Sequence, residues 1–298
     1  MEKRDEFSTY SPAVSATFFA GSVIFGMFFI HPLFLGCSLL LSTIYYISVR
    51  GGSSWRFISV MLLLFLAVSA INPLFNTSGE TTIFSLPGGR PYTLEALFYG
   101  MAVAAMFVSV MTWFASYSAV MTEDKLMYVM GRAAPALTMI LSMVFRLIPE
   151  YRRRIKAIAD GRRCIGMDVR KGSRRGRAEN GISVLSILFT WALERGIVTA
   201  DSMRSRGYGG KGRTAFSLYR VERRERLLLI FMGALMAIII FCGLKGAAGA
   251  VYVPRIEMET ADNAYFVAGL SSYLVFLSIP AAINIKEEIT WRVLRSRI

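Results

Sequence analysis

The stretch from Leu227 to Leu244, LLLIFMGALMAIIIFCGL, contains no charged residue and no proline. Roughly 20 apolar residues in an α-helix cross the hydrocarbon core of a bilayer, because the helix rises about 1.5 Å per residue. His31-Pro32 separates two of the other runs, since a residue before proline disfavours helix. The sequence therefore predicts an all-α fold, a polytopic membrane helix bundle with about six transmembrane helices. The other apolar runs are Pro12–Ile30, His31–Val49, Phe57–Phe75, Ala96–Val120 and Ala264–Ile285.

The composition agrees with a membrane protein. Of the 298 residues, 54% are hydrophobic and 18% are charged, and the mean hydropathy is +0.49. A water-exposed surface of ordinary polarity needs more charge than this. Cys37, Cys164 and Cys242 lie far apart, and the chain has a single histidine. These spacings exclude a disulfide framework, a zinc site and a haem site, so we expect neither a metal nor another cofactor.

The distribution of basic residues predicts the topology, because short cytoplasmic loops collect lysine and arginine. The whole chain carries a net charge of +14, and the stretch from Glu150 to Arg226 holds 20 basic and 8 acidic residues, which gives +12. This stretch is predicted to be cytoplasmic, whereas the nearly neutral connection from Asn76 to Glu95 is predicted to lie outside. We expect a multi-pass protein of the cell membrane with both termini in the cytoplasm. The expected regions are N-terminal transmembrane helices (1–121), a cytoplasmic region (122–226), and C-terminal transmembrane helices with a basic tail (227–298).

The six runs, as delimited, contain no Asp, Glu, Lys or Arg. Charged side chains inside a membrane usually mark proton relays, ion coupling or catalysis. Their absence from these runs argues against an ion-coupled carrier. We therefore look for the functional residues in the basic region.

Two amphipathic helices are predicted in the cytoplasmic region 122–226. The first covers Ala133–Ile148, at the inner interface or under the bundle, and can continue past Pro149 through Arg152–Arg163 as a kinked helix. The second begins near Gly181 and ends at Gly207, a residue that suits a left-handed helix stop. Its apolar face comprises Ile182, Leu185, Phe189, Ala192 and Gly196, spaced three and four residues apart.

Arginines stand at the end of each predicted helix. The guanidinium group of arginine remains charged and can grip a carboxylate with two hydrogen bonds. Two such helices attached to a bundle without internal charge suggest a docking part that transmits force. The plainer interpretation is a capped surface helix with solvated arginines.

The segment Asp201–Thr214, DSMRSRGYGGKGRT, resembles the A-M-x-x-R-G-Y-G segment of the transmembrane T component of energy-coupling factor (ECF) transporters, the EcfT/CbiQ family. The resemblance covers about residues 30 to 285. Further segments that agree are Asn72-Pro73-Leu74-Phe75 followed by Gly79, Thr93-Leu94-Glu95-Ala96 with Tyr99-Gly100, and Leu141-Ser142-Met143 followed by Arg146 and Pro149.

The resemblance implies a scaffold that joins two cytoplasmic ABC-type ATPases to a substrate-binding membrane subunit, the S component, for uptake of a vitamin or a metal ion. It also implies two coupling helices within residues 122–226, each ending in an X-Arg-X motif that docks on one ATPase. The second motif corresponds to Ser205-Arg206-Gly207. The first falls in Gly161–Asp168, GRRCIGMD, where alignment on Gly166 and Asp168 replaces the motif arginine by Ile165. Arg163 is the candidate substitute, and Arg162 points roughly 100° away from it on a continuing helix.

Two other functions remain open from the residues. A polytopic membrane enzyme could act on a phosphorylated lipid at the inner interface, but it lacks a candidate base or metal-binding carboxylate pair, since Asp160 and Asp168 are eight positions apart and have no histidine beside them. A basic anchor could bind membrane lipid through Arg170–Arg177, which is also a possible secondary role in the scaffold. The phosphate-binding pattern G-x-x-x-x-G-K-[ST] is absent from the sequence, so ATP hydrolysis is expected in partner subunits. A nucleic-acid partner is not expected.

Overall fold

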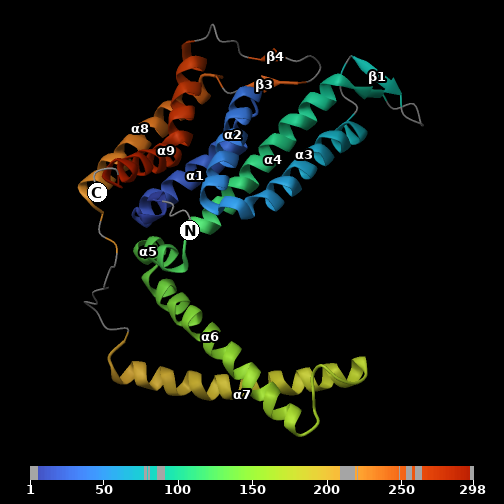
Figure 1. Cartoon of the computed structure of the whole chain (residues 1–298), viewed down its shortest axis with the longest axis vertical. Coiled ribbons are helices and arrows are strands. Elements are labelled where there is room, and N and C mark those ends of the chain that lie inside the picture. Colours follow the sequence, from blue (N-terminus) through green and yellow to red (C-terminus); the bar gives the residue numbers. More distant parts are fainter. Residues whose placement is uncertain are drawn as a thin grey trace. The chain divides into compact units, whose positions relative to one another are not determined.

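A computed structural model describes residues 6–76, 79, 81–85, 91–208, 219, 221–247, 249–252, 257–258 and 264–295 (Figure 1). Most of these residues are helical. The helices are η1 (Glu6–Thr9), α1 (Pro12–Phe28), α2 (Pro32–Arg50), η2 (Gly51–Ser53), α3 (Ser54–Phe75), α4 (Leu94–Val120), α5 (Glu123–Ala133), α6 (Pro135–Cys164), α7 (Arg174–Ser205), α8 (Arg223–Leu244) and α9 (Ala264–Arg295). Two short antiparallel hairpins pair β1 (Thr82–Ser85) with β2 (Pro91–Thr93), and β3 (Ala250–Val251) with β4 (Glu257–Met258).

The chain divides into two units. The first, here called the bundle, contains residues 1–129 and 219–298. The second, here called the arm, contains residues 130–218 and consists mainly of α6 and α7. The chain therefore leaves the bundle within α5 and returns to it just before α8.

The prediction of a helical membrane bundle is confirmed, because six helices in the described part of the chain are long and apolar enough to cross a membrane. The second to sixth predicted runs lie in five of them, namely α2, α3, α4, α8 and α9. The first run forms α1, which has 17 residues and packs against α4 and α8 inside the bundle. The sixth helix that is long and apolar enough is α7, which belongs to the arm. The sequence predicts that α7 lies in the cytoplasm.

Aromatic side chains fill the core of the bundle. Phe18 of α1 lies 5.4 Å from both Trp113 of α4 and Phe276 of α9, measured between ring centroids. Trp113 is fully buried and donates a hydrogen bond from Nε1 to Ser38 Oγ of α2, at 3.2 Å. A buried indole N–H needs such an acceptor. This cluster therefore fixes how four helices of the bundle meet.

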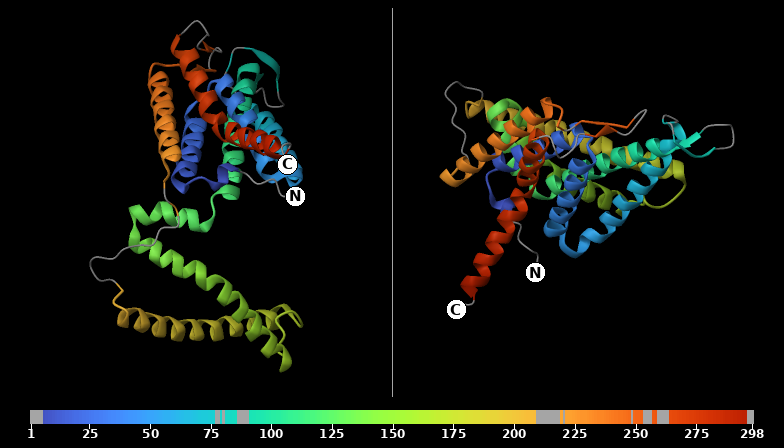
Figure 2. Two further views of the ribbon diagram at one scale, coloured as in Figure 1. Left: turned by 60° about the vertical axis from the view of Figure 1, so that its left-hand side comes forward. Right: turned by 90° about the horizontal axis from the view of Figure 1, so that it is seen from above.

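Close helix packing in the bundle depends on glycine at one position. A Cβ atom added at Gly100 of α4 would lie 2.9 Å from the carbonyl oxygen of Ser69 and from Cβ of Asn72, both on α3. Such a distance is too short for any side chain. Gly100 thus allows α3 and α4 to approach each other closely. Elsewhere in the bundle, α9 changes direction along its length (Figure 2), and Pro280 lies inside it, as expected for a proline bend.

The two hairpins lie at the end of the bundle where α3 ends and α4 begins (Figure 1). Tyr252, which follows β3, is buried and donates a hydrogen bond from its hydroxyl to the carbonyl of Ile30, at 2.9 Å. Burial raises the pKa of Tyr252 to about 12. This contact ties the α8–α9 connection to the turn between α1 and α2.

Candidate functional site

Within the arm, α6 and α7 form an antiparallel hairpin whose middle is held by Trp191. The rings of Tyr151 and Trp191 meet edge to face at 5.8 Å, and the Arg154 guanidinium lies 5.1 Å from the Trp191 ring centroid. An ion pair joins Arg195 to Glu150 at 3.8 Å. Pro149 lies inside α6, so the predicted continuation of this helix past the proline is confirmed. Figure 1 shows the two helices crossing in this region.

A polar network organises the connection between the two helices. Arg162 donates from Nη2 to Asn180 Oδ1 at 3.4 Å, and Asn180 donates from Nδ2 to the carbonyl of Asp168 at 3.3 Å. The Asp168 carboxylate accepts a hydrogen bond from the Arg170 backbone N–H at 2.9 Å and pairs with Arg163 Nε at 3.6 Å. The end of α6 is therefore joined to the first turns of α7.

Helix α7 ends in a glycine cap next to Arg206. Gly207 has φ +73°, the Tyr208 N–H donates to the Met203 carbonyl at 3.1 Å, and the Gly207 N–H donates to the Arg204 carbonyl at 3.1 Å. This is the Schellman arrangement, in which glycine accepts the left-handed conformation at little cost. Arg206 is the last residue before the glycine and is exposed.

Helix α6 ends in the same arrangement. Gly166 has φ +80°, the Met167 N–H donates to the Arg162 carbonyl at 3.0 Å, and the Gly166 N–H donates to the Arg163 carbonyl at 3.1 Å. The residue before the glycine is Ile165, which is 68% exposed. The two caps correspond position by position, so Ile165 matches Arg206.

Helix α7 has two apolar faces. One face packs against α6 through the buried Val184 and through Trp191. The other face is exposed and includes three of the predicted residues, Ile182, Leu185 and Phe189. The predicted Ala192 lies at its edge and is half-buried. Two apolar faces explain why α7 reaches the hydropathy of a membrane span although it carries charged residues at both ends.

The chain is similar to proteins of a known family. The cobalt transport protein family, CbiQ, matches residues 8–216, which is most of the chain. This chain belongs to the CbiQ family. The match includes the arm and both glycine caps. The family resemblance predicted from the sequence motifs is therefore confirmed.

Two curated relatives carry the name energy-coupling factor transporter transmembrane protein EcfT. The protein from Listeria innocua serovar 6a is 33% identical over 104 residues, which are 35% of this chain and 39% of the relative. The protein from Lactococcus lactis subsp. cremoris is 32% identical over 95 residues, 32% of this chain and 36% of the relative. The matched segments thus span less than half of either relative. This CbiQ-family chain is a multi-pass membrane protein of a transport family.

The predicted docking residues of the CbiQ-family motifs lie at the two ends described above. Ser205, Arg206 and Gly207 close α7, and all three are exposed. Arg163 matches Arg204 rather than Arg206 in the cap, is 62% exposed, and pairs with Asp168. Arg162 is half-buried, and its Nη2 contacts Asn180 and the sulfur of Met167. Ile165, and not Arg163, therefore occupies the position that corresponds to Arg206.

Sequence reasoning missed several features near the family segments. Helix α4 begins at Leu94, so Glu95 lies inside the helix rather than just before it, and it is buried. Its carboxylate accepts hydrogen bonds from the Thr81 N–H at 3.2 Å and from the Thr81 hydroxyl at 2.5 Å. The acidic residue immediately before the apolar run was the available signal, since the first turn of a helix favours a carboxylate. The exposed face of α7 also extends to Leu193 and Ile197, beyond the predicted set.

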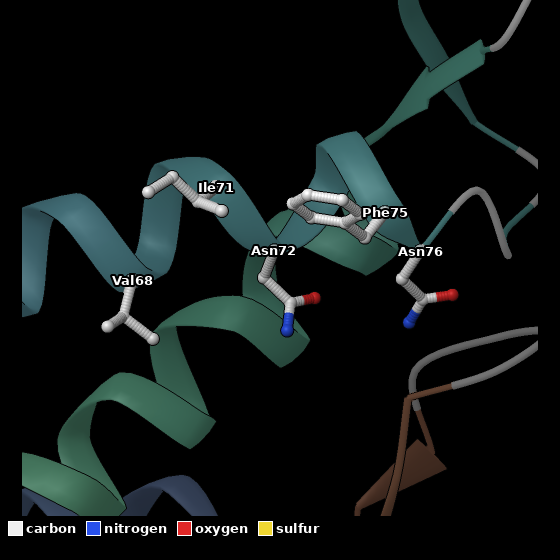
Figure 3. A pocket seen from close by; sticks show the side chains of 5 residues that line it. All are labelled: Val68, Ile71, Asn72, Phe75 and Asn76. Atoms are coloured by element: carbon white, nitrogen blue, oxygen red, sulfur yellow. The ribbon is translucent and has the colours of Figure 1, made fainter.

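Asn72 lines a pocket of about 480 Å³ near the end of α3 (Figure 3). The amide groups of Asn72 and Asn76 point toward the same side of the helix, with Val68, Ile71 and Phe75 around them. In the described part of the chain, Asn72 Oδ1 is buried without a hydrogen-bond partner. Within that part, no group of three or more His, Cys, Asp or Glu side chains is placed to hold a metal ion.

Proposed function

We propose that this protein is the transmembrane scaffold and coupling subunit of an ECF-type ABC importer. In this proposal it links two cytoplasmic ABC-type ATPases to a substrate-binding S component. The observation that carries the proposal is the arm: a helical hairpin with two matched glycine caps and an uncovered apolar face. Membership of the CbiQ family and the names of the two relatives also support the proposal of a coupling subunit.

In the proposal, the cap of α7 docks on one ATPase through Arg206. An exposed arginine that follows the last helical turn can reach a carboxylate in a partner's groove and form a bidentate pair. The cap fixes the backbone on both sides of Arg206, so little conformational freedom of the backbone remains to be lost on binding. The cap of α6 docks on the second ATPase through Ile165 and the neighbouring Arg163.

The exposed face of α7 serves a different partner. Ile182, Leu185 and Phe189 form a contiguous apolar surface that α6 leaves uncovered. A patch of this kind on a water-facing surface normally marks an interface. An S component is a membrane protein and carries an apolar outer surface, which makes it a suitable cover. Membrane lipid is the remaining contact, through the transmembrane helices and through the basic residues Arg170–Arg177.

The proposed orientation places the arm and both termini in the cytoplasm. It rests on the +12 charge between residues 150 and 226, because cytoplasmic segments collect basic residues. We assign the transmembrane helices in 1–121 and 227–298 to anchoring and the region 122–226 to coupling. The substrate, a vitamin or a metal ion, is recognised by the S component, and ATP is hydrolysed by the partner ATPases.

Copurification tests this proposal directly. The tagged chain is coexpressed with the ABC ATPases and the S component encoded in its own genome, and is purified in mild detergent. The expected result is a complex with two ATPase subunits and one S component, whose ATP hydrolysis depends on the ATPases. If the chain elutes without ATPases and itself converts a phosphorylated lipid, the membrane-enzyme alternative holds instead.

A further inference from the structure

The residues just before α1 are bonded to several elements of the bundle. These residues, Glu6–Ser11, are here called the N-terminal brace. Phe7 is fully buried, and its ring meets Phe18 at 5.5 Å and Tyr45 at 6.3 Å, in both cases edge to face. The Phe7 N–H donates to Asn284 Oδ1 of α9 at 3.2 Å. The brace is therefore anchored in the aromatic core and on the last helix.

A buried lysine joins the brace to the point where the chain leaves the bundle. Lys125 lies in the first turns of α5 and is only 6% exposed. Its Nζ donates to the carbonyl of Val120, the last residue of α4, at 3.2 Å, and also to the carbonyl of Ser8 in the brace. An ammonium group is rarely buried unless acceptors surround it. Lys125 thus fixes α5 to both α4 and the brace.

A glutamate makes the equivalent contact where the chain returns to the bundle. Glu225, in the first turn of α8, accepts a hydrogen bond from the Ser11 N–H on Oε1 at 2.7 Å. Its Oε2 accepts from the Glu222 N–H at 3.0 Å, which closes the start of α8. One carboxylate therefore ties the brace to the first turn of α8.

The two junctions also touch each other. The rings of Tyr128, in the middle of α5, and Tyr219, just before α8, meet edge to face at 5.5 Å. Residues 129 and 219 are the bundle residues that flank the arm in the chain. The exit and the return of the chain therefore meet at one place, and the brace is bonded to both sides of it.

We propose that Lys125 and Glu225 are positioning residues that hold the two junctions of the arm through the N-terminal brace. With both junctions fixed, movement of the arm is passed to α8 and α9 instead of being absorbed by bending at residues 121–129 and 219–226. The mechanical role rests on the proposed function, whereas the structural role of the brace does not.

Hydrogen exchange on the purified full-length chain tests the brace without any partner. The variant Lys125→Met keeps the apolar stem and removes the ammonium, and Glu225→Gln keeps the shape and removes the charge. Lys125→Met removes two charge-assisted hydrogen bonds, and the loss of one such bond already corresponds to about a tenfold ratio. We therefore expect amide exchange in residues 123–129 to become at least about tenfold faster in this variant. The matched control is Lys245→Met, a lysine at the other end of α8 that contacts Phe241. Exchange at residues 123–129 that stays at the wild-type rate in Lys125→Met overturns the brace.

Uptake per ATP hydrolysed, measured with the assembled importer in liposomes, tests the positioning role. A merely structural defect lowers assembly, so uptake and ATP hydrolysis fall together and their ratio stays constant. We expect Lys125→Met and Glu225→Gln to retain ATP hydrolysis while uptake per ATP falls at least about threefold, with Lys245→Met at the wild-type ratio. A constant ratio in both variants overturns the positioning role. If the wild-type chain binds no ATPase, the proposed function fails, and the exchange result alone decides whether the brace exists.

Discussion

Ile165 and Arg206 occupy the same position in two copies of one helix cap. Each is the last residue before a left-handed glycine, and their backbone angles are close, φ −98° and ψ 16° for Ile165 against φ −85° and ψ 2° for Arg206. One end of the arm therefore presents an apolar side chain where the other end presents a cation. The two ends are alike in backbone and unlike in chemistry, so two partners that bind them with similar grooves are held unequally.

The first prediction concerns this asymmetry. Ile165→Arg places a guanidinium at the position that matches Arg206. We therefore expect retention of the ATPase that docks on the α6 cap to stay intact or to increase. Among alanine variants, Arg163→Ala should loosen ATPase association more than Arg162→Ala and less than Arg206→Ala. Arg163 is exposed with only a 3.6 Å pair to Asp168, whereas Arg162 is engaged within the arm.

The measurement is retention of each ATPase on the purified variants across a salt series, because a partly exposed ionic contact weakens with ionic strength. Equal retention for all three alanine variants would show that the apolar faces hold the complex and that the arginines only set its register.

The apolar runs could be predicted because backbone groups in a membrane must bond internally, which leaves a helix as the simple solution for about 20 apolar residues. The cap of α7 was also readable, since Gly207 after the predicted helix suits a left-handed stop. The start of α7 was not, because Arg174 and Arg175 stand in its first turn, where cations oppose the helix dipole. Helix α5 is short and charged and gave no apolar run.

Contacts distant in sequence lay beyond prediction. The bond from Phe7 to Asn284 spans 277 positions, and neither residue belongs to a recognisable pattern. The pairing of Arg163 with Asp168 depends on where the chain turns after Gly166, which spacing alone does not fix. The family segments indicated which residues to examine, but not that Ile165 and Arg206 share one cap position.

The second prediction concerns topology. In a background without Cys37, Cys164 and Cys242, Ser85→Cys should react with a membrane-impermeant thiol reagent added to intact cells. Arg174→Cys should be protected there and react only after the membrane is opened. The reason is the basic charge of residues 150–226 against the nearly neutral segment 76–95. The opposite labelling pattern would place the arm outside and exclude docking on cytoplasmic ATPases.

The third prediction is a pH dependence of stability at Tyr252. Burial raises its folded-state pKa to about 12, above an unfolded value of about 10. Its contribution is therefore present below pH 10 and is lost as the pH rises toward 12, because the unfolded state releases the proton first. Tyr252→Phe should be less stable by about 1 kcal/mol at pH 8, where the bond to the Ile30 carbonyl is lost.

Thermal unfolding of wild type and Tyr252→Phe in detergent between pH 8 and pH 11.5 measures this effect. The other tyrosines are present in both proteins, so their ionisation does not contribute to the difference. The stability gap between wild type and Tyr252→Phe should narrow as the pH passes 10. A gap that remains constant over this range would mean that Tyr252 ionises as easily in the folded protein as in the unfolded chain.

The central claim is that Arg206 docks the arm on an ATPase, and charge reversal with a neighbouring control tests it most directly. Retention of the ATPases is measured for Arg206→Glu, Arg206→Lys and Arg204→Glu, because Arg204 is also exposed and lies two positions earlier on the same helix end. Arg206→Glu should cost about 2 to 5 kcal/mol of docking, the range for broken charge pairs at interfaces. Arg206→Lys should weaken docking less because it keeps the positive charge, but it should not be neutral because it loses the planar fork. Arg204→Glu should weaken docking less than Arg206→Glu. If Arg206→Glu retains both ATPases and supports full uptake, Arg206 is only a cation at a helix end and the docking claim is wrong.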